Sequence, residues 1–174
     1  ADGGEAIALG ADISDRAQVK AAVAKLREAF GAITVLVNNA GVTDFVPFEE
    51  ITEERWEVVY RINVLGQIIV TQEVLPDMKA KGWGRVVMIS SSSGQTGAVG
   101  MATYSSSKGA IITLTRTLAQ ELGPHGITVN CLAPGPFLTD LPGSLLSAEE
   151  KSWFAKRTAI GRWGDPRELA GPAL

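Results

Sequence analysis

Tyr104 and Lys108 are the residues whose types and spacing first suggest chemistry. They stand four positions apart, and in a helix this spacing places both side chains on one face. A free tyrosine has a pKa of about 10, which makes it a poor acid or base at neutral pH. A nearby lysine ammonium favours the phenolate and lowers that pKa into a useful range. Because the spacing also arises by chance, the pair alone is a weak signal.

Ser91 lies thirteen residues before Tyr104, directly after an apolar run that predicts a buried strand. Open α/β sheets bind ligands at the carboxyl ends of their strands, so the Ser91 hydroxyl is placed to donate to a substrate oxygen. The alternative is that the serine run 90–93 is simply a polar turn, which we prefer for its other three members. Asn63 stands within an expected helix, although asparagine has a low helix propensity. Taken by itself, this position suggests a surface or packing role.

These side chains need a scaffold, and the hydrophobic pattern indicates one. Short apolar runs alternate with longer amphipathic stretches, which is typical of an α/β fold with a parallel sheet. The expected strands are Ala6–Leu9, Ile33–Val37, Arg85–Ser90 and Ile127–Leu132. The expected helices run from a Ser14 cap to Phe30, from Thr52 to about Lys81 with an interruption near Pro76, and from Thr103 to Leu122.

Several short motifs together resemble the classical short-chain dehydrogenase/reductase family over nearly the whole chain. They are Asn38-Asn39-Ala40-Gly41, Asn63, Ile89-Ser90-Ser91, Tyr104-x-x-x-Lys108 and Pro134-Gly135, in the family's order and spacing. No single motif is specific, but the joint pattern is. The resemblance implies a Rossmann-like doubly wound parallel sheet, ordered 3-2-1-4-5-6-7, and one partial domain over residues 1–174. The segment 134–142 is most similar to gluconate 5-dehydrogenase members, with 3-oxoacyl-carrier-protein reductases next.

The same resemblance implies an activity and its residues. The protein would interconvert a secondary alcohol and a ketone, with NAD or NADP supplying or accepting the hydride. Tyr104 would be the general acid or base, while Lys108 would lower its pKa and bind the nicotinamide ribose. Ser91 would polarise the substrate carbonyl, and Asn63 would hold a water in a proton relay behind Lys108.

Further positions are implied to contact the cofactor. Asp12 and Ile13 would flank the adenine ring, and Asn39, Ala40 and Gly41 would lie at the adenosine ribose. The nicotinamide carboxamide would be met by Pro134, Gly135, Phe137 and Thr139. Asn38 is expected to tie neighbouring strands together instead. The alternative for residues 134–140 is a proline-stiffened turn, but the accompanying motifs favour the cofactor role.

An apolar stretch follows the expected nicotinamide loop, where this family builds its substrate lid. Its members are Leu141, Leu145, Leu146, Trp153, Phe154 and Trp163. The alternative is that they belong to the core or to a subunit contact. With few basic residues, such a lid suits a neutral or modestly polar substrate.

Composition excludes several other functions. The net charge of −3 gives no electrostatic reason to expect nucleic acid or a membrane surface as partner. No apolar run is long enough to cross a bilayer, and no secretory signal begins the sequence, so a cytoplasmic location is expected. The single histidine, His125, and the single cysteine, Cys131, cannot build a zinc site. We expect His125 to lie away from the strands' carboxyl ends and Cys131 to be a buried small hydrophobe.

The glycine-rich TGxxxGxG turn that receives the cofactor pyrophosphate in this family does not occur in the sequence. Residues 1–9 correspond to the approach to the family's third strand, so the first two strands and the last are expected to be absent. Ala6–Leu9 would then lack a neighbour, and Ile33–Val37 would expose an apolar edge.

Three explanations remain open: a part of a longer protein, which we favour, an expressed fragment, and a truncated gene product. The alternative to an active enzyme is a catalytically silent piece that keeps only assembly surfaces. In the family, the helices equivalent to 52–81 and 103–122 form subunit contacts, which predicts a homo-oligomer, a dimer or a tetramer. The sequence leaves open the choice between NAD and NADP.

Overall fold

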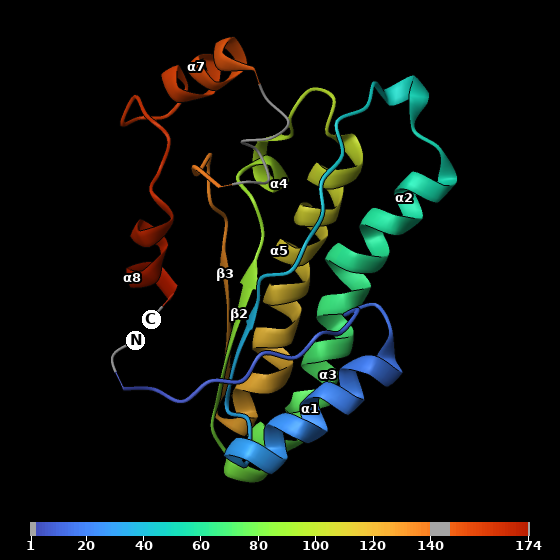
Figure 1. Cartoon of the computed structure of the whole chain (residues 1–174), viewed down its shortest axis with the longest axis vertical. Helices are drawn as coiled ribbons and strands as arrows, with labels where there is room; N and C mark the ends of the chain where they lie inside the picture. Colours follow the sequence, from blue (N-terminus) through green and yellow to red (C-terminus); the bar gives the residue numbers. More distant parts are fainter. Residues whose placement is uncertain (1–2, 140–146, 174) are drawn as a thin grey trace.

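Three parallel strands form the centre of the structure, a computed structural model that describes residues 3–139 and 147–173 (Figure 1). They are β1 (Val35–Asn38), β2 (Gly84–Ile89) and β3 (Ile127–Leu132), hydrogen-bonded in the order β1-β2-β3. In the register, Val35 lies opposite Arg85, and Gly84 lies opposite Ile127. The α/β fold with a parallel sheet is confirmed, and three of the four expected strands are present with small changes at their ends.

Helices connect the strands and follow the last of them. The longer ones are α1 (Arg16–Phe30), α2 (Glu53–Tyr60), α3 (Gln67–Lys81), α5 (Ala102–Leu122) and α7 (Ala148–Lys156). The shorter ones are α4 (Ser93–Thr96), α8 (Ala170–Ala173), the 3₁₀ turns η1 (Phe48–Glu50), η3 (Gly123–His125) and η4 (Pro166–Leu169), and the π-helical segment η2 (Arg61–Gly66). No helix among the described residues is long and apolar enough to span a bilayer.

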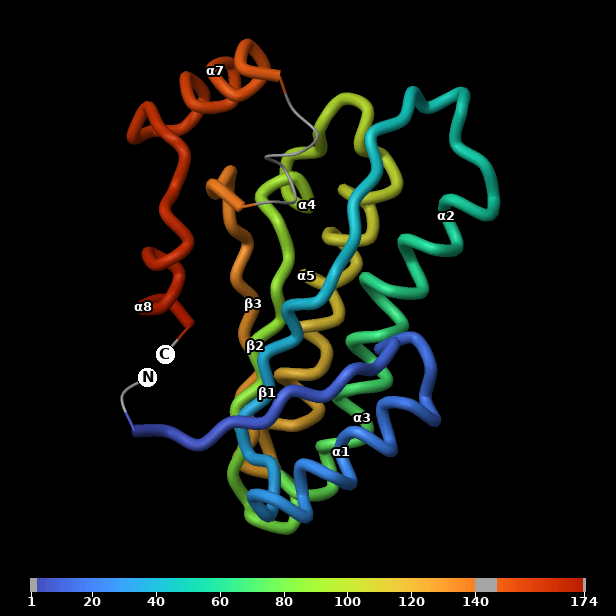
Figure 2. The backbone as a smooth tube through the Cα atoms, in the orientation of Figure 1, coloured from blue at the N-terminus to red at the C-terminus, as the bar shows by residue number. Residues whose placement is uncertain are grey.

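The hydrophobic core lies between the sheet and one layer of helices. Helices α3 and α5 contact the sheet, and α1 packs against α3, as the backbone trace in Figure 2 shows. The fully or nearly fully buried core residues are Val19, Val23, Ile69, Val74, Met78, Val86, Met88, Ile111, Leu122, Ile127 and Val129. Since side chains alternate across a strand, Val86 and Met88 point from β2 into this layer.

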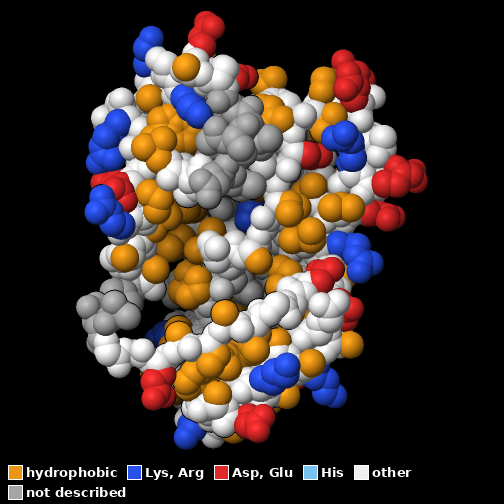
Figure 3. All heavy atoms as spheres, viewed as in Figure 1, with side chains coloured by type: hydrophobic (Ala, Val, Ile, Leu, Met, Phe, Trp, Pro, Cys, Tyr) orange, Lys and Arg blue, Asp and Glu red, His pale blue; other side chains and the backbone are white. Residues whose placement is uncertain are grey.

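The opposite face of the sheet is open at β1. Val35 and Val37 are 53% and 50% exposed, whereas Asn38 is buried on the helix side. The amide of Asn38 donates to Thr71 Oγ1 of α3 at 2.9 Å and to Met88 Sδ of β2 at 3.2 Å, so its expected structural role is supported. β1 lies at the edge of the described sheet, as expected, and its exposed valines belong to the face that points away from the helices. Hydrophobic side chains are exposed at several places on the molecular face drawn in Figure 3.

Residues 6–9 do not form the expected strand. They are assigned no strand and make no ladder with β1, and Ile7 and Leu9 are 43% and 36% exposed. A strand is stabilised by pairing its backbone groups with a neighbour, and no described segment lies beside these residues in the sheet. Their β-like composition therefore does not lead to a strand here.

Two helix boundaries also differ from expectation. The α1 cap is Asp15, whose carboxylate accepts from the amides of residues 17 and 18, because the Ser14 hydroxyl and amide are both bonded to Asp12. The long second helix is interrupted at residues 61–66, where it becomes π-helical, and Pro76 lies inside α3 without breaking it. The interruption coincides with the buried side chain of Asn63, which bonds to a neighbouring loop in place of solvent.

Candidate active site

A pocket of about 560 Å³ lies where the three strands end. The segments after β1, β2 and β3 each line it, as expected for parallel strands whose carboxyl ends meet at one edge. The lining residues are Asn39, Ala40, Gly41, Thr43, Phe45, Ile89–Ser93, Ala98, Met101, Tyr104, Lys108, Pro134–Phe137, Thr139, Phe154, Trp163 and Leu169. The structure thus brings together Ser91, Tyr104, Lys108 and most of the expected cofactor contacts.

Tyr104 and Lys108 lie one turn apart near the start of α5, and both line the pocket. Lys108 is only 3% exposed, and its Nζ donates to the carbonyl of Ile89 at 2.8 Å. The same Nζ lies 5.7 Å from the centroid of the Tyr104 ring. The end of β2 therefore holds the lysine ammonium beside the tyrosine.

Burial shifts the pKa values of both groups. It raises the pKa of Tyr104, against a smaller opposing effect of the Ser91 side chain, and lowers the pKa of Lys108 to about 8. The expectation of a lowered tyrosine pKa is wrong for this arrangement. Desolvation of the phenolate dominates, since Lys108 directs its hydrogen bond to the Ile89 carbonyl and not to the phenol oxygen.

Asn63 is fully buried and fastens the loop after β1 to the π-helical segment. Its Oδ1 accepts from the Val42 amide at 2.8 Å, and its Nδ2 donates to the Val42 carbonyl at 2.9 Å and to Ser107 Oγ at 3.0 Å. A Cβ added at Gly41 would meet Asn63 Oδ1 at 3.1 Å and Lys108 Nζ at 3.3 Å. Asn63 is therefore a neighbour of Lys108, as expected, and a surface position is excluded.

The serines after β2 have different surroundings. Ser91 Oγ accepts from the Ser93 amide at 3.2 Å and from the Ser93 hydroxyl at 3.0 Å, inside the pocket. Ser90 is 3% exposed and donates its hydroxyl to the carbonyl of Lys108 at 2.7 Å. The polar-turn interpretation is therefore wrong for Ser90, which links β2 to α5 at the Lys108 carbonyl. No sequence signal separates Ser90 from the neighbouring serines.

Two expected adenine contacts do not reach the pocket. Asp12 accepts from the amide and the hydroxyl of Ser14, and Ile13 packs against Gly66, where an added Cβ would meet it at 2.7 Å. Neither Asp12 nor Ile13 lines the pocket. His125 lies in η3, which precedes β3 at the other end of the sheet, in agreement with the expectation that it is not catalytic.

The expected lid divides into two parts. Phe154 and Trp163 line the pocket with their rings edge to face, 6.1 Å between centroids, and Trp163 Nε1 donates to the Lys151 carbonyl at 2.8 Å. Trp153 does not line the pocket and is 54% exposed. The three expected lid leucines, Leu141, Leu145 and Leu146, lie outside the described residues.

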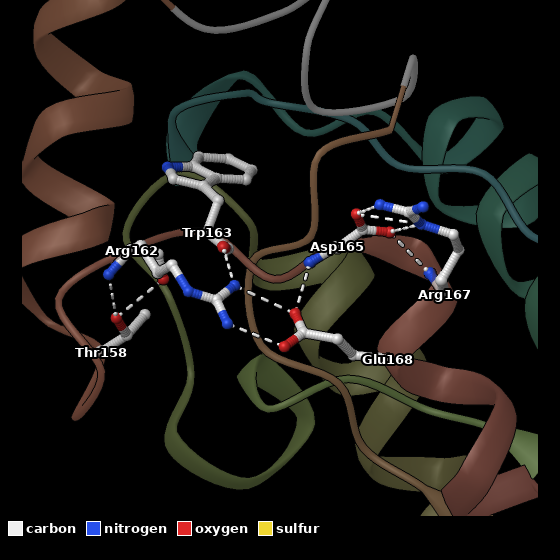
Figure 4. A network of polar contacts seen from close by, with 6 residues as sticks. All are labelled: Thr158, Arg162, Trp163, Asp165, Arg167 and Glu168. Carbon is white, nitrogen blue, oxygen red and sulfur yellow. Dashed lines mark hydrogen bonds and ion pairs between the residues drawn. The ribbon is translucent and has the colours of Figure 1, made fainter.

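A polar network joins residues 158–168, the end of the lid segment, to one another (Figure 4). Arg162 donates to both carboxylate oxygens of Glu168, at 3.0 and 2.7 Å, and to the carbonyl of Trp163 at 2.9 Å. Gly164 then pairs with Phe137 in a parallel β-bridge. The sequence analysis missed this network, although a Ser/Thr/Asp residue followed three positions later by Glu, here Asp165 and Glu168, is a recognisable capping signal.

Comparisons with known proteins agree with this geometry. The family model described as short chain dehydrogenase matches residues 1–150. The chain belongs to the short-chain dehydrogenase family. This is a family of NAD(P)-dependent oxidoreductases, and the resemblance found in the motifs is confirmed.

Similar members of the short-chain dehydrogenase family carry the names expected from the sequence. The chain is 37% identical to a 5-keto-D-gluconate 5-reductase of Escherichia coli K12 over 174 residues, which are 99% of this chain and 68% of the relative. It is 37% identical to a 3-oxoacyl-[acyl-carrier-protein] reductase of Synechocystis over 171 residues, 98% of this chain and 68% of that one.

A solved short-chain dehydrogenase gives the structural comparison. The crystal structure of a gluconate 5-dehydrogenase from Burkholderia cenocepacia J2315, in complex with NADP and tartrate, matches with a TM-score of 0.89 and 36% identity. The match covers 94% of this chain and 64% of that chain. The chain therefore spans about two thirds of the length of these relatives.

The residues present fit the nicotinamide half of such a cofactor. Gly41 leaves the space beside Lys108 that any Cβ would fill. Thr43 lines the same pocket, and its buried Oγ1 has no hydrogen-bond partner among the described residues. A buried hydroxyl without a partner is unfavourable unless a ligand supplies one, so this end of the pocket suits a polar cofactor group.

Proposed function

We propose that the protein interconverts a secondary alcohol and a ketone with NAD or NADP, and that Tyr104 is its general acid and base. The observation that carries this proposal is the convergence of Ser91, Tyr104 and Lys108 in one pocket at the strand ends. NAD(P)H supplies the hydride when it is bound. The chain supplies the proton and the groups that orient the substrate.

Ketone reduction requires a protonated phenol, and the alkoxide that develops is basic enough to take the proton even of a weakly acidic one. Burial keeps the phenol protonated at neutral pH, so its proton is available to the alkoxide oxygen that develops as the carbonyl is reduced. The Ser91 hydroxyl donates to the same oxygen and stabilises its developing charge. The Tyr104 phenolate is then reprotonated from solvent through the groups on its far side, where Asn63 and Lys108 are neighbours.

Lys108 holds the cofactor side of the site in this proposal. Its ammonium has three N–H donors, and the hydrogen bond to Ile89 uses one of them. The remaining donors would be available to the ribose hydroxyls of the nicotinamide nucleotide. Asn39, Ala40 and the loop 134–139 complete the cofactor side, with Pro134, Gly135, Phe137 and Thr139 along the pocket.

Replacement of Tyr104 tests the mechanism. Tyr104→Phe removes only the acidic hydroxyl, and we expect kcat for ketone reduction to fall by about 10²- to 10⁴-fold while NAD(P)H binding persists. The control is Tyr60→Phe, because the second tyrosine stacks on Trp56 in α2, away from the pocket. Full activity in Tyr104→Phe would refute the assignment.

A second candidate function is assembly without catalysis. It is supported by apolar side chains exposed on α2 and η2, namely Trp56 at 45%, Val58 at 54% and Leu65 at 41%. We propose that this surface joins copies of the chain in a dimer or tetramer. Sedimentation at several concentrations tests the assembly, and cofactor titration by fluorescence distinguishes an enzyme from a silent piece: absence of binding at millimolar NAD(P)H favours the latter.

A further inference from the structure

Apolar side chains form most of the pocket wall away from Ser91 and Tyr104. Outside the loop 134–139, which is assigned to the cofactor, the aromatic ones are Phe45, Phe154 and Trp163, and the aliphatic ones are Ala98, Met101 and Leu169. Phe154 and Trp163 meet edge to face, so each offers part of a ring surface to the pocket. Such a wall favours a flat or branched hydrocarbon group over a chain of hydroxyls.

The pocket also lacks a cation that could receive an acid. Among the described residues, Lys108 is the one charged side chain that lines it, and its ammonium is buried against the Ile89 carbonyl. Residues 140–146, which the structure does not describe, have the sequence DLPGSLL, with one acidic residue and no basic one. Apart from Lys108, an anionic substrate group would thus find neutral hydrogen-bond donors but no cation among the described lining residues.

The two arginines within the lid stretch, Arg157 and Arg162, already have interaction partners. Arg162 is paired with Glu168 at 2.7 Å and bonded to the Trp163 carbonyl, and Arg157 stacks on Trp153 with 4.5 Å to the ring centroid. Neither arginine lines the pocket. Moving Arg162 into the pocket would break the network of Figure 4 that holds the lid segment.

We propose, on the basis of the proposed function, that the substrate is a neutral ketone or secondary alcohol bearing an apolar ring or branched chain, and not a sugar acid. A carboxylate entering this pocket would lose its water without gaining a cation, which is strongly unfavourable. A ring entering it would displace water from Phe154 and Trp163, which is favourable. The substrate class therefore differs from the one in the names of the gluconate relatives.

The test compares two ketones that differ by one carboxylate, acetophenone and 4-acetylbenzoate, with 5-keto-D-gluconate as a third compound. NAD(P)H oxidation gives kcat/KM, and calorimetric titration gives binding independently of turnover. We expect kcat/KM for acetophenone to exceed that for 4-acetylbenzoate by about 100-fold, because the charged group is desolvated without a partner.

Two phenylalanines provide matched variants. Phe154→Ala, in the pocket wall, should raise the KM for acetophenone by about tenfold with little change in kcat, since it removes ring contacts that the ground state and the transition state make equally. Phe48→Ala, at a position that is 79% exposed and outside the pocket lining, should leave that KM unchanged. Circular dichroism of both variants checks that the helices persist.

The outcomes separate the substrate class from the reaction. Equal or better use of 4-acetylbenzoate or 5-keto-D-gluconate would overturn the inference and leave the oxidoreductase function intact. If no ketone is reduced but acetophenone binds and the acids do not, the substrate class stands and the proposed reaction fails. If the acids bind at least as tightly as acetophenone, the inference is wrong whatever the turnover.

Discussion

Replacing Asn63 by leucine should lower the free energy of unfolding far more than a typical substitution in a helix does. The side chain makes three hydrogen bonds, two to the backbone of Val42 and one to Ser107. Leucine satisfies none of them, while Ser107 keeps its own bond to the Tyr104 carbonyl at 2.7 Å. The Val42 amide and the Val42 carbonyl are thus the two groups left without a hydrogen-bond partner.

The magnitude follows from those two groups. A buried polar group left without a partner costs about 1–3 kcal/mol. Val42 is half-buried, so its two groups predict a smaller loss of roughly 1–4 kcal/mol in the free energy of unfolding. That is a large part of the 5–15 kcal/mol that is typical of a whole domain. Asn63→Asp keeps an acceptor for the Val42 amide, but it buries a carboxylate that faces the Val42 carbonyl, so it should destabilise the chain at neutral pH at least as much as leucine does.

Urea unfolding followed by circular dichroism measures the effect, with the midpoint compared at constant slope. Arg61→Leu is the matched control, because it makes the same substitution at an exposed position of the same π-helical segment. Exposed substitutions are usually within about 0.5 kcal/mol of the parent. A loss of that size for Asn63→Leu as well would refute the argument that this side chain fastens the loop.

Two further changes test the pKa of the lysine and the lid network. Burial lowers the pKa of Lys108 to about 8, against about 10.5 in the unfolded chain, so between these pH values only the unfolded chain binds the proton. The free energy of unfolding should therefore rise by roughly 2–3 kcal/mol as the pH increases across this window. Lys108→Met should abolish the rise, which is measured as the difference between the urea midpoints at pH 7 and pH 10. Glu168→Gln removes the charged partner of the lid network, so the amides of Leu138 and Gly164, which form the β-bridge, should exchange with deuterium about tenfold faster.

Each of these changes has its own control. Lys156→Met, at an exposed lysine of α7, should keep the rise in stability with pH, and a rise that survives in Lys108→Met would assign it to another group. Arg167→Gln affects a side chain that is 90% exposed and bonded to Asp165, outside the bridge. Unchanged exchange in Glu168→Gln, or equal acceleration in Arg167→Gln, would show that the bridge does not depend on Glu168.

Strands and helix faces were predictable because they depend on local patterns. The apolar runs at 85–90 and 127–132 gave nearly correct strands, and the spacing of Tyr104 and Lys108 gave their common helix face. The family's motif order then indicated which loops meet, and the pocket lining supports that prediction for seven of the nine residues assigned only to the cofactor.

The remaining features depend on contacts between distant segments. Ser90 bonds to the carbonyl of a residue 18 positions away, and Asn63 bonds to a loop 21 positions away, so neither role is visible in local composition. The strand expected at 6–9 failed because pairing requires a neighbour, which composition cannot supply. The raised pKa of Tyr104 required knowledge of burial at the site, whereas the spacing showed only that a cation was near.

The two ends of the pocket are held by interactions of different kinds, which gives them different sensitivities to salt. Asn63, Ser90 and Lys108 hold the end near Tyr104 through buried hydrogen bonds, which dissolved ions hardly affect. The lid end depends on Arg162 and Glu168, whose side chains are 54% and 46% exposed, so their attraction is screened as ionic strength rises. A rise in salt concentration should therefore weaken the contacts that position Phe154 and Trp163, and with them the binding of the proposed apolar substrate group, while the surroundings of Tyr104 stay unchanged.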